Sequence, residues 1–400
     1  MKVVVCQIGS RHRYAVPQIF EQAGMLSVFF CDACTENHLL KPVAKLLPNK
    51  IRRSLLERKA GVPAEKIYST ILPNIVIAVL KIFRRKLTAD DFVFQSRIFD
   101  YRILLHGLPD ADVLFTFSRT NYILVRKLKS RSVKNVVDVI ISPATEQIMT
   151  KEYSRNSTWA TITHGLQLSE AQLKRNLQYW KRTISMADLL LCPSQWVVDG
   201  ILAIAPEASP RIRLVPYGCS IDYGKERNVP IPGKVIFCGN EPVRKGLSYL
   251  AEAALILRES DPDIQIQVIG AIDERICRDP LCRGLKFLGK MSQEEMKKQY
   301  LRADVFVLPS LSEGFAGVIA EAVTAGVPCV VTKESGSRIQ NEYDGLVIES
   351  RSAEAIVNAV RQIVRDRVLR SRMSEACLKQ REYYTFEAWK KRLIEAVRSL

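Results

Sequence analysis

The chain contains 400 residues, of which 47% are hydrophobic and 25% are charged. This composition excludes a disordered or fibrous protein and supplies enough apolar material for two sizeable hydrophobic cores. No apolar run reaches about 18 residues, so no transmembrane helix is expected, and the opening residues MKVVVCQIG predict a strand rather than a signal peptide.

The net charge of +17 is distributed unevenly along the chain. Up to residue 230 there are 33 Lys and Arg against 19 Asp and Glu, an excess of +14, whereas the remainder has 26 against 23, or +3. A basic N-terminal half is suited to a polyanion or an anionic membrane surface. The alternative is a generally basic proteome, in which this half would have no special partner.

The ten cysteines are scattered, with a single C-x-x-C pair at Cys31 and Cys34. Because a structural zinc site needs four ligands at matched spacings, no zinc site is predicted. Several other cysteines lie in apolar runs and are expected to be buried thiols: Cys6, Cys192, Cys238 and Cys329. Free thiols of this kind indicate a reducing cytoplasm.

The first half of the chain alternates between predicted strands and helices. Residues 2–7 form a strand, Gly9 and Ser10 follow in a glycine loop, and a helix covers about 14–23. Further strands are predicted at 113–117, 136–141, 160–163 and 189–192. This alternation predicts a parallel, doubly wound α/β sheet.

Residues 71–83 form a strongly apolar segment that ends in Arg84, Arg85 and Lys86. An apolar helix flanked by cations would suit shallow insertion at an anionic bilayer. The alternative is a helix packed against the core of the first domain, with its cations in solvent.

Residues 228–233, NVPIPG, predict a domain boundary, and the alternating pattern restarts after it. The domains are therefore predicted at 1–228 and 229–385, followed by an amphipathic helix at 386–400. In the second domain the predicted strands are 234–238, 264–269, 286–288, 304–308 and 346–348, and the predicted helices are 247–258, 293–301 and 353–364.

The segment 305–332 carries the most chemical information. It predicts a buried strand, a loop with Glu313 and Gly314, a helix with Glu321 that stops at Gly326, and a second strand. Two carboxylates eight positions apart can converge on one ligand at the carboxyl edge of a parallel sheet, where open α/β sheets bind ligands. The alternative is an ordinary strand–helix–strand unit with a solvated loop.

A second group lies where strand 234–238 ends in Gly239 and a helix begins near Gly246. Arg244 and Lys245 are placed at the positive end of that helix dipole, which is unfavourable unless an anion is present. A phosphate or diphosphate would resolve the conflict. The alternative is a solvent-facing pair that costs roughly a few tenths of a kcal/mol each.

Two Asp-x-Asp triplets, at 110–112 and 261–263, directly precede predicted strands. They should lie at the amino edge of their sheets, away from ligands, and we interpret them as turn residues. The protein is therefore expected to need no metal and no other cofactor, with Lys and Arg in place of Mg²⁺.

In order and spacing, these motifs resemble the retaining glycosyltransferases of the GT-B fold, in the large group often called group 4, which use sugar nucleotides. The resemblance implies an α/β protein of two Rossmann-like domains facing across a cleft, with the C-terminal helix crossing back to the first domain. The matching stretches cover the C-terminal half almost continuously: 187–194, 213–222, 235–246, 287–293, 303–309, 313–321 and 344–346.

The resemblance also implies roles for individual residues of the second domain. Its E-x7-E motif falls on Glu313 and Glu321, which would face the donor sugar and the ribose hydroxyls. Arg244 and Lys245 would hold the diphosphate and stabilise the leaving group. Asn240 stands where the family commonly has Arg, and we expect Arg244 to supply that charge. The other predicted donor-binding positions are Gly239, Gly314, Phe315, Ala316 and Gly317.

In the first domain, Gly9 and Ser10 match the family's first glycine loop, which approaches the phosphates from across the cleft. His164, in ATITHG, matches the family's strand–His–Gly position near the reacting carbon and would be catalytic together with Glu313, Lys245 and Arg244. The alternative is that His164 is only structural, and residues 11–13 either contact ligand or face solvent.

The expected function is transfer of a sugar, with retention, from a nucleoside-diphosphate sugar to a hydroxyl acceptor such as a lipid-linked or surface glycan. The enzyme would be cytoplasmic, or peripheral at the inner face of a membrane, with no nucleic-acid partner. Two alternatives remain: a non-catalytic GT-B-like module that binds a polyanion or membrane through the basic half, and a GT-B enzyme of other chemistry such as an epimerase.

Overall fold

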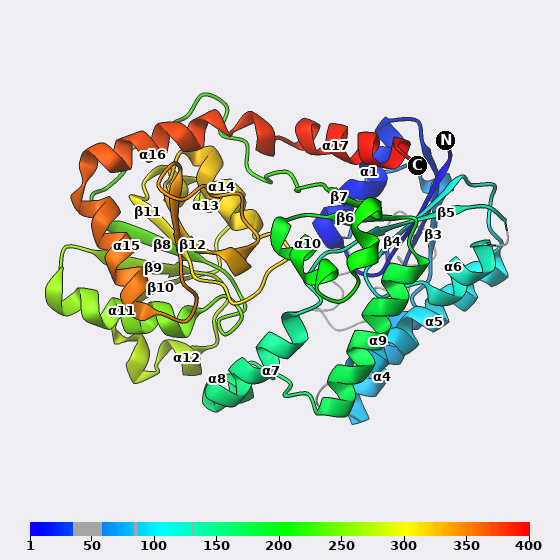
Figure 1. Cartoon of the computed structure of the whole chain (residues 1–400), viewed down its shortest axis with the longest axis horizontal. Coiled ribbons are helices and arrows are strands. Elements are labelled where there is room, and N and C mark those ends of the chain that lie inside the picture. Colours follow the sequence, from blue (N-terminus) through cyan, green and yellow to red (C-terminus); the bar gives the residue numbers. More distant parts are fainter. Residues whose placement is uncertain (35–57, 84–86, 130) are drawn as a thin grey trace.

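The computed structural model describes residues 1–34, 58–83, 87–129 and 131–400, which form two α/β domains side by side (Figure 1). The first sheet has seven strands in the order β3-β2-β1-β4-β5-β6-β7, and the second has six in the order β10-β9-β8-β11-β12-β13. Every strand pair in both sheets is parallel. The prediction of two Rossmann-like domains is confirmed. The cations Arg84, Arg85 and Lys86, which end the apolar segment 71–83, lie outside the described residues.

The first domain surrounds its sheet with helices from the alternating pattern. Its strands are β1 (Val3–Gln7), β2 (Leu26–Cys31), β3 (Ile67–Ser69), β4 (Val113–Phe117), β5 (Lys134–Asp138), β6 (Leu189–Cys192) and β7 (Ile212–Leu214). Its helices are α1 (Ala15–Gln22), α4 (Leu72–Phe83), α5 (Ala89–His106), α6 (Tyr122–Lys129), α7 (Thr145–Arg155), α8 (Ser157–Ile162), α9 (Glu170–Met186) and α10 (Gln195–Leu202).

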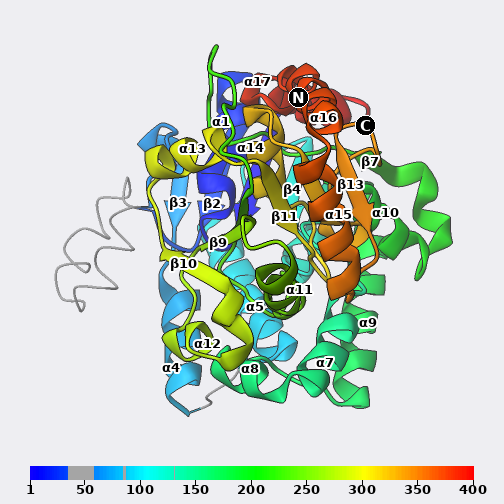
Figure 2. The ribbon, with the colours of Figure 1, turned by 90° about the vertical axis from the view of Figure 1, so that its left-hand side faces the viewer.

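The second domain repeats this organisation, and Figure 2 shows α11 and α15 toward the viewer. Its strands are β8 (Lys234–Cys238), β9 (Gln265–Ile269), β10 (Leu285–Gly289), β11 (Val305–Leu308), β12 (Cys329–Thr332) and β13 (Gly345–Ile348). Its helices are α11 (Leu247–Ser260), α12 (Glu274–Cys277), α13 (Gln293–Leu301), α14 (Gly317–Ala325), α15 (Ala353–Arg365), α16 (Arg367–Lys379) and α17 (Phe386–Arg398).

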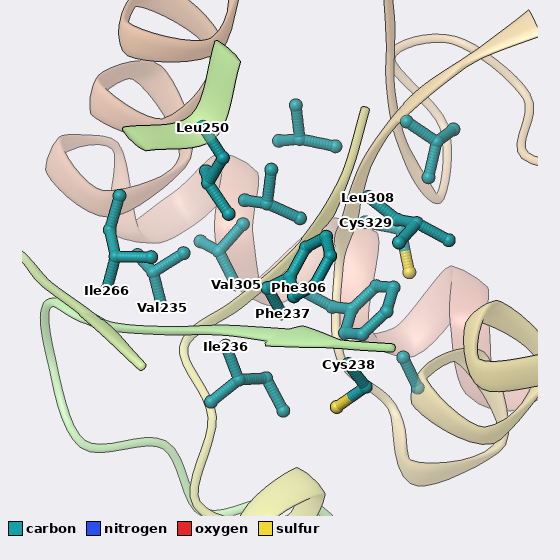
Figure 3. Close-up of a cluster of buried hydrophobic side chains, with 14 of the residues drawn as sticks. Val235, Ile236, Phe237, Cys238, Leu250, Ile266, Val305, Phe306, Leu308 and Cys329 are labelled. Atoms are coloured by element: carbon teal, nitrogen blue, oxygen red, sulfur yellow. The ribbon is translucent and has the colours of Figure 1, made fainter. Parts of the chain in front are cut away.

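The central strands of the second sheet are buried on both faces, which is why their sequences are continuously apolar. In Figure 3, Val235 and Phe237 lie on one face of β8, and Ile236 and Cys238 lie on the other. All four side chains are buried. The predicted strand and helix pattern of this domain is therefore confirmed, including the helix at 293–301, which Ser292 caps by accepting a hydrogen bond from the Glu295 amide at 3.3 Å.

The chain passes from the first sheet to the second between β7 and β8. The linker contacts the second domain from Asn228 onward. The Asn228 side chain donates hydrogen bonds to the carbonyl oxygens of Tyr300 and Ala303, both at 2.8 Å. The predicted boundary after residue 228 falls within this linker.

The last helix returns to the first domain, as predicted. Thr385 caps α17, whose Trp389, Leu393 and Val397 are buried in a cluster with residues of β1, β4 and α1. Lys390 also donates to Gln22 of α1 at 2.9 Å, and both views place α17 beside α1 (Figures 1 and 2).

One predicted strand is wrong: residues 160–163 lie in helix α8 and the turn that follows it. Asn156 starts this helix, because its side chain accepts a hydrogen bond from the Trp159 amide at 3.1 Å. Trp159 is 1% exposed and belongs to the core cluster of the second domain. Its indole N–H donates to Asp279 at 2.8 Å, so this short β-branched run is held as a helix by tertiary packing that overrides its strand propensity.

No helix within the described ranges combines the length and the apolar character needed to cross a bilayer.

Candidate active site

The carboxyl edges of the two sheets face one another, and the loops that follow the strands meet there. After β5, the Thr145 and Ser312 hydroxyls lie 2.8 Å apart. After β6, the Ser194 hydroxyl donates to the Gly314 carbonyl oxygen at 2.5 Å. A Cβ atom added at Gly314 would lie 1.8 Å from the carbonyl oxygen of Ile140, so only glycine permits this approach.

Glu313 lies in this contact and accepts from both cations of the Gly239–Gly246 loop. Its carboxylate is 2.8 Å from the Lys245 ammonium and also pairs with the Arg244 guanidinium. The Glu313 side chain is only 9% exposed. Burial alone would raise the pKa of this carboxyl group, but Lys245 and Arg244 outweigh burial and hold the pKa below its usual value. Glu313 is therefore ionised and already forms ion pairs with both Lys245 and Arg244.

The predicted cation conflict at the start of α11 is resolved within the protein. Arg244 forms a bidentate pair with Glu241 at 2.8 and 2.9 Å and also donates to the Ser312 carbonyl oxygen at 2.9 Å. Burial alone would lower the pKa of Arg244, but the carboxylates of Glu241 and Glu313 outweigh burial and raise it. The stem of Lys245 crosses Gly239, where an added Cβ would lie 2.1 Å from the lysine Cδ. Both cations are thereby aimed at Glu313.

Asn240 has a structural contact at this edge of the sheet. Its side-chain oxygen accepts from the Ala271 amide at 2.8 Å and ties the loop after β8 to the loop after β9. Arg244 lies beside Lys245, since both pair with Glu313, and its role as the second charge on a diphosphate stays a prediction.

Glu321 lies in the second turn of α14, the helix that begins at Gly317 with Ala316 as its N-cap residue. It accepts from the Ser220 hydroxyl at 2.6 Å and the Tyr300 hydroxyl at 3.0 Å. Burial raises the pKa of the Glu321 carboxyl, although Ser220, Tyr300, Arg13 and Lys245 oppose the rise. Lys245 lowers the pKa of both Glu313 and Glu321, so the two carboxylates lie within electrostatic range of the same cation.

The first residues of α14 complete this side of the site. The first amides of a helix lack a carbonyl partner one turn back, and the helix dipole makes this end of α14 attractive to electron-rich oxygen atoms. The Ile319 amide already donates to the Ala316 carbonyl oxygen at 2.8 Å. Phe315 packs between Tyr217, with ring centroids 5.6 Å apart, and Tyr384 at 6.3 Å. This aromatic support fixes the loop that carries Glu313 and Gly314.

The Gly9 loop approaches from the first domain with an unusual backbone. His12, Arg13 and Tyr14 have consecutive φ values of 48°, 52° and 62°, a left-handed run that is strained for non-glycine residues. Tyr14 is anchored by its hydroxyl on the Ala33 carbonyl oxygen at 2.9 Å. Arg13 reaches across to Gln293 of the second domain at 3.4 Å. The strain therefore turns this loop, with Gly9 and Ser10 at its start, toward the second domain.

His164 does not follow a strand, because it lies directly after α8 with a φ of 56°. Its imidazole is exposed and forms no hydrogen bond with any side chain in the described part of the chain. It lies next to Thr163, which lines a pocket of about 240 Å³ together with Asn240, Arg244 and Asp273. The strand end on which its role was predicted is absent, and its catalytic role stays a prediction.

Known proteins resemble this arrangement in sequence and in fold. Residues 225–380 match the family model described as glycosyl transferases group 1. The match to this family therefore lies in the second domain and covers less than half of the chain.

Two curated proteins are similar to the chain over part of its length. A D-inositol 3-phosphate glycosyltransferase of Corynebacterium urealyticum is 28% identical over 55% of the chain and 58% of its own length. A UDP-Gal:alpha-D-GlcNAc-diphosphoundecaprenol alpha-1,3-galactosyltransferase of Escherichia coli is 32% identical over 34% of the chain and 37% of its own length. The chain thus spans less than two thirds of either relative.

Solved structures match the chain over both domains. The sucrose-phosphate synthase of Thermosynechococcus elongatus has a TM-score of 0.67 at 16% identity. The match covers 100% of this chain and 99% of the synthase chain. Anabaena HepE in complex with UDP and glucose has a TM-score of 0.61 at 14% identity, with full coverage of both chains. These likenesses confirm the GT-B fold.

Some residues of this candidate site are not indicated by the sequence. Ser220 and Tyr300, the partners of Glu321, carry no local signal because they lie 101 and 21 positions away in the chain. Asp138 could have been found, since it is a carboxylate at the end of an apolar strand on the ligand edge. It accepts from the Tyr217 hydroxyl at 2.8 Å, and burial raises its pKa to about 7 although Tyr217 and Arg11 lower it.

The two Asp-x-Asp triplets lie at the amino ends of β4 and β9, as expected. Asp112 accepts from the Lys2 amide at 2.6 Å, and Asp261 pairs with Arg361 and Arg365, both at 2.8 Å. These carboxylates therefore have partners within the protein.

Proposed function

We propose that this glycosyltransferase of the group 1 family moves a sugar, with retention of configuration, from a nucleoside-diphosphate sugar to a hydroxyl acceptor. One observation carries the proposal: two cations and two carboxylates share one sheet edge, and Lys245 lies within electrostatic reach of both Glu313 and Glu321. A nucleoside-diphosphate sugar presents two polyol groups and one bridging anion. Carboxylates suit the polyols and cations suit the anion.

Donor binding would proceed by an exchange of partners. The diphosphate takes the place of the Glu313 carboxylate on Lys245 and Arg244, and the released carboxylate accepts hydrogen bonds from the sugar hydroxyls. Glu321 accepts from the ribose, with the Ser220 hydroxyl as the contact it would replace. The first amides of α14 face the electron-rich sugar oxygen atoms.

The chemical step follows from these charges. As the glycosidic bond breaks, negative charge develops on the leaving diphosphate, and Lys245 and Arg244 stabilise it in a site with little water. The same phosphate takes the proton of the acceptor hydroxyl on the face from which it leaves, which retains the anomeric configuration. In this mechanism Lys245 and Arg244 supply the charge that a metal ion supplies in other transferases, so no metal is required.

For the acceptor we propose a lipid-linked or polysaccharide glycan presented in the cytoplasm. The name of the Escherichia coli relative, which includes a diphosphoundecaprenol acceptor, supports this class. The face of α4 that carries Leu72, Ile75 and Val79 is exposed, at the i, i+3 and i+7 spacing of one helix face. The opposite face, with Pro73 and Ile77, is buried. Peripheral contact of α4 with an anionic membrane fits this amphipathic helix.

The decisive experiment is a screen of nucleotide sugars by thermal shift, followed by measurement of slow donor hydrolysis without acceptor. A donor at 100 times its dissociation constant stabilises the protein by about 2.7 kcal/mol. Lys245→Ala and Glu313→Ala should abolish hydrolysis, whereas Lys298→Ala on the exposed surface of α13 should leave it unchanged. Full hydrolysis in both site variants would refute the proposal. Product analysis separates transfer from epimerisation.

The non-catalytic alternative finds no support. A module that binds only polyanions gains nothing from two buried carboxylates beside its cations. Co-sedimentation with vesicles, with and without anionic lipid, tests the membrane contact separately from catalysis. Absence from the pellet at every salt concentration would end the α4 proposal and leave the transferase proposal intact.

A further inference from the structure

The first domain has a pocket of its own, apart from the candidate active site, on the side that faces away from the other domain. It lies between α5, α6 and α9 at the far edge of the molecule in Figure 1 and has a volume of about 590 Å³, within the range of small-molecule sites. None of its lining residues belongs to the candidate active site. The group 1 region, residues 225–380, does not include it.

The lining of this pocket is strongly basic. Arg97 of α5, Arg126 and Lys127 of α6, and Arg182 of α9 converge on it, and no carboxylate lines it among the residues that the structure describes. Within the described ranges, Arg97, Arg126 and Arg182 have no carboxylate at salt-bridge distance. Elsewhere on α9, by contrast, Arg175 is paired with Asp90 at 3.2 Å. Converging like charges repel one another, so an anion in this pocket would remove an unfavourable interaction.

The walls of the pocket are fixed before any ligand binds. Tyr122 is buried beneath the Arg182 guanidinium, which lies 5.7 Å from the ring centroid, and its hydroxyl is 3.0 Å from that of Thr183. The buried carboxylate of Asp100 accepts from the amides of Ile123 at 2.9 Å and Leu124 at 3.3 Å, which ties α5 to the first turn of α6. Guanidinium groups held in this way match the oxygen atoms of phosphate.

An apolar surface adjoins the cations on α5. Phe94, Tyr101 and Leu105 are 49%, 58% and 78% exposed, and their spacing places them on the same helix face as Arg97. Exposed aromatic and aliphatic side chains beside a basic pocket indicate a ligand with an anionic group and an apolar part.

We propose that the α5–α6–α9 pocket is a second anion site, which binds a phosphate group through Arg97, Arg126 and Arg182. The exposed face of α5 receives the apolar part of the molecule that carries the phosphate. A phospholipid head group and a soluble phosphate compound share this chemistry. The proposal does not depend on the transferase activity, because the site lies outside the candidate active site.

The test compares two double variants that remove equal charge. Arg97→Gln with Arg126→Gln alters the pocket, and Arg102→Gln with Lys174→Gln alters exposed cations of α5 and α9 outside it. The soluble probe is inorganic pyrophosphate, measured by calorimetry in a Lys245→Ala background, which removes the donor site. The membrane probe is phosphatidylcholine vesicles containing phosphatidic acid, measured by co-sedimentation. The pocket variant should bind at least one probe tenfold or more weakly than the control variant.

Loss of vesicle binding alone would identify a lipid phosphate, and loss of pyrophosphate binding alone would identify a soluble ligand; both outcomes support the site. Arg126→Lys, which keeps the charge but not the planar fork, should show an intermediate loss. Unaltered melting temperatures check that the exposed substitutions leave the fold intact. Equal binding of the pocket and control variants to both probes, or no binding by the unsubstituted pocket, would overturn the proposal.

Discussion

The substitution Glu313→Gln tests whether this carboxylate occupies the cations that a donor diphosphate would use. Without Glu313, Lys245 loses the one carboxylate that it contacts in the described part of the chain, while Arg244 keeps its bidentate pair with Glu241. Removing one partner of a buried ion pair costs about 3–5 kcal/mol, and we expect about 3 kcal/mol because Arg244 stays paired. At about 2–4 °C per kcal/mol for a domain of this size, the melting temperature should fall by about 6–12 °C.

The same substitution should strengthen the binding of a nucleoside diphosphate. In the unaltered protein the diphosphate must displace Glu313, whereas in the variant it meets two uncompensated cations, so the affinity for UDP should rise about tenfold, or ~1.4 kcal/mol. Differential scanning fluorimetry and calorimetry with UDP measure the two effects, with Glu294→Gln on the exposed surface of α13 as the control. An unchanged melting temperature together with weaker UDP binding would refute the exchange of partners.

Four further predictions concern the surrounding contacts. Glu321→Ala should reduce the preference for UDP over dUDP, measured by calorimetry, from about tenfold to near unity, because the carboxylate no longer accepts from the ribose. The pKa of Asp138 in the folded protein is raised to about 7, so between pH 4 and 7 the folded state of the unaltered protein binds a proton that the unfolded state has lost. The unaltered protein therefore loses stability as pH rises through this window, and Asp138→Asn does not. The free energy of unfolding of the variant, relative to that of the unaltered protein, should rise by about 1 kcal/mol per pH unit. Urea unfolding at pH 5 and 8 measures this difference, and parallel profiles would contradict it. Trp159→Phe removes the bond to Asp279 and should lower the free energy of unfolding by about 1–2 kcal/mol in chemical denaturation. If His164 is catalytic, as the resemblance implies, His164→Ala should reduce donor hydrolysis by about a hundredfold; a change of less than about threefold would contradict this role.

Most of the second domain could be predicted from its sequence because its elements are locally consistent. The strands around Phe237 and Val307 are continuous apolar runs, which is the pattern of parallel strands buried on both faces. Ser292 marks the start of α13 and Gly326 marks the end of α14, the latter with the left-handed φ of 87° that favours glycine. Local signals and tertiary packing agree at these positions.

The candidate site could be predicted only in part, for a geometric reason. The topology of a parallel sheet brings strand ends to one edge, so Glu313 and Lys245 could be assigned to one site although 68 positions separate them. That they pair with each other in the free protein could not be predicted, because the pairing depends on the path of the Lys245 stem over Gly239. Ser220 and Tyr300 approach Glu321 from a linker and a helix, where no periodic pattern marks them.

The failure at residues 160–163 and the strain at residues 12–14 have one physical cause. Both segments take a conformation that their own sequence disfavours, and both are held by contacts with elements distant in the sequence. Trp159 is buried in the core of the second domain and so ties α8 to that domain. His12 packs against Tyr217 and against Trp389 of α17, with ring centroids 4.1 and 5.4 Å apart, and both partners belong to the cluster of the first domain. Each conformation thus depends on residues that are distant in the sequence, a property that no single stretch of sequence encodes.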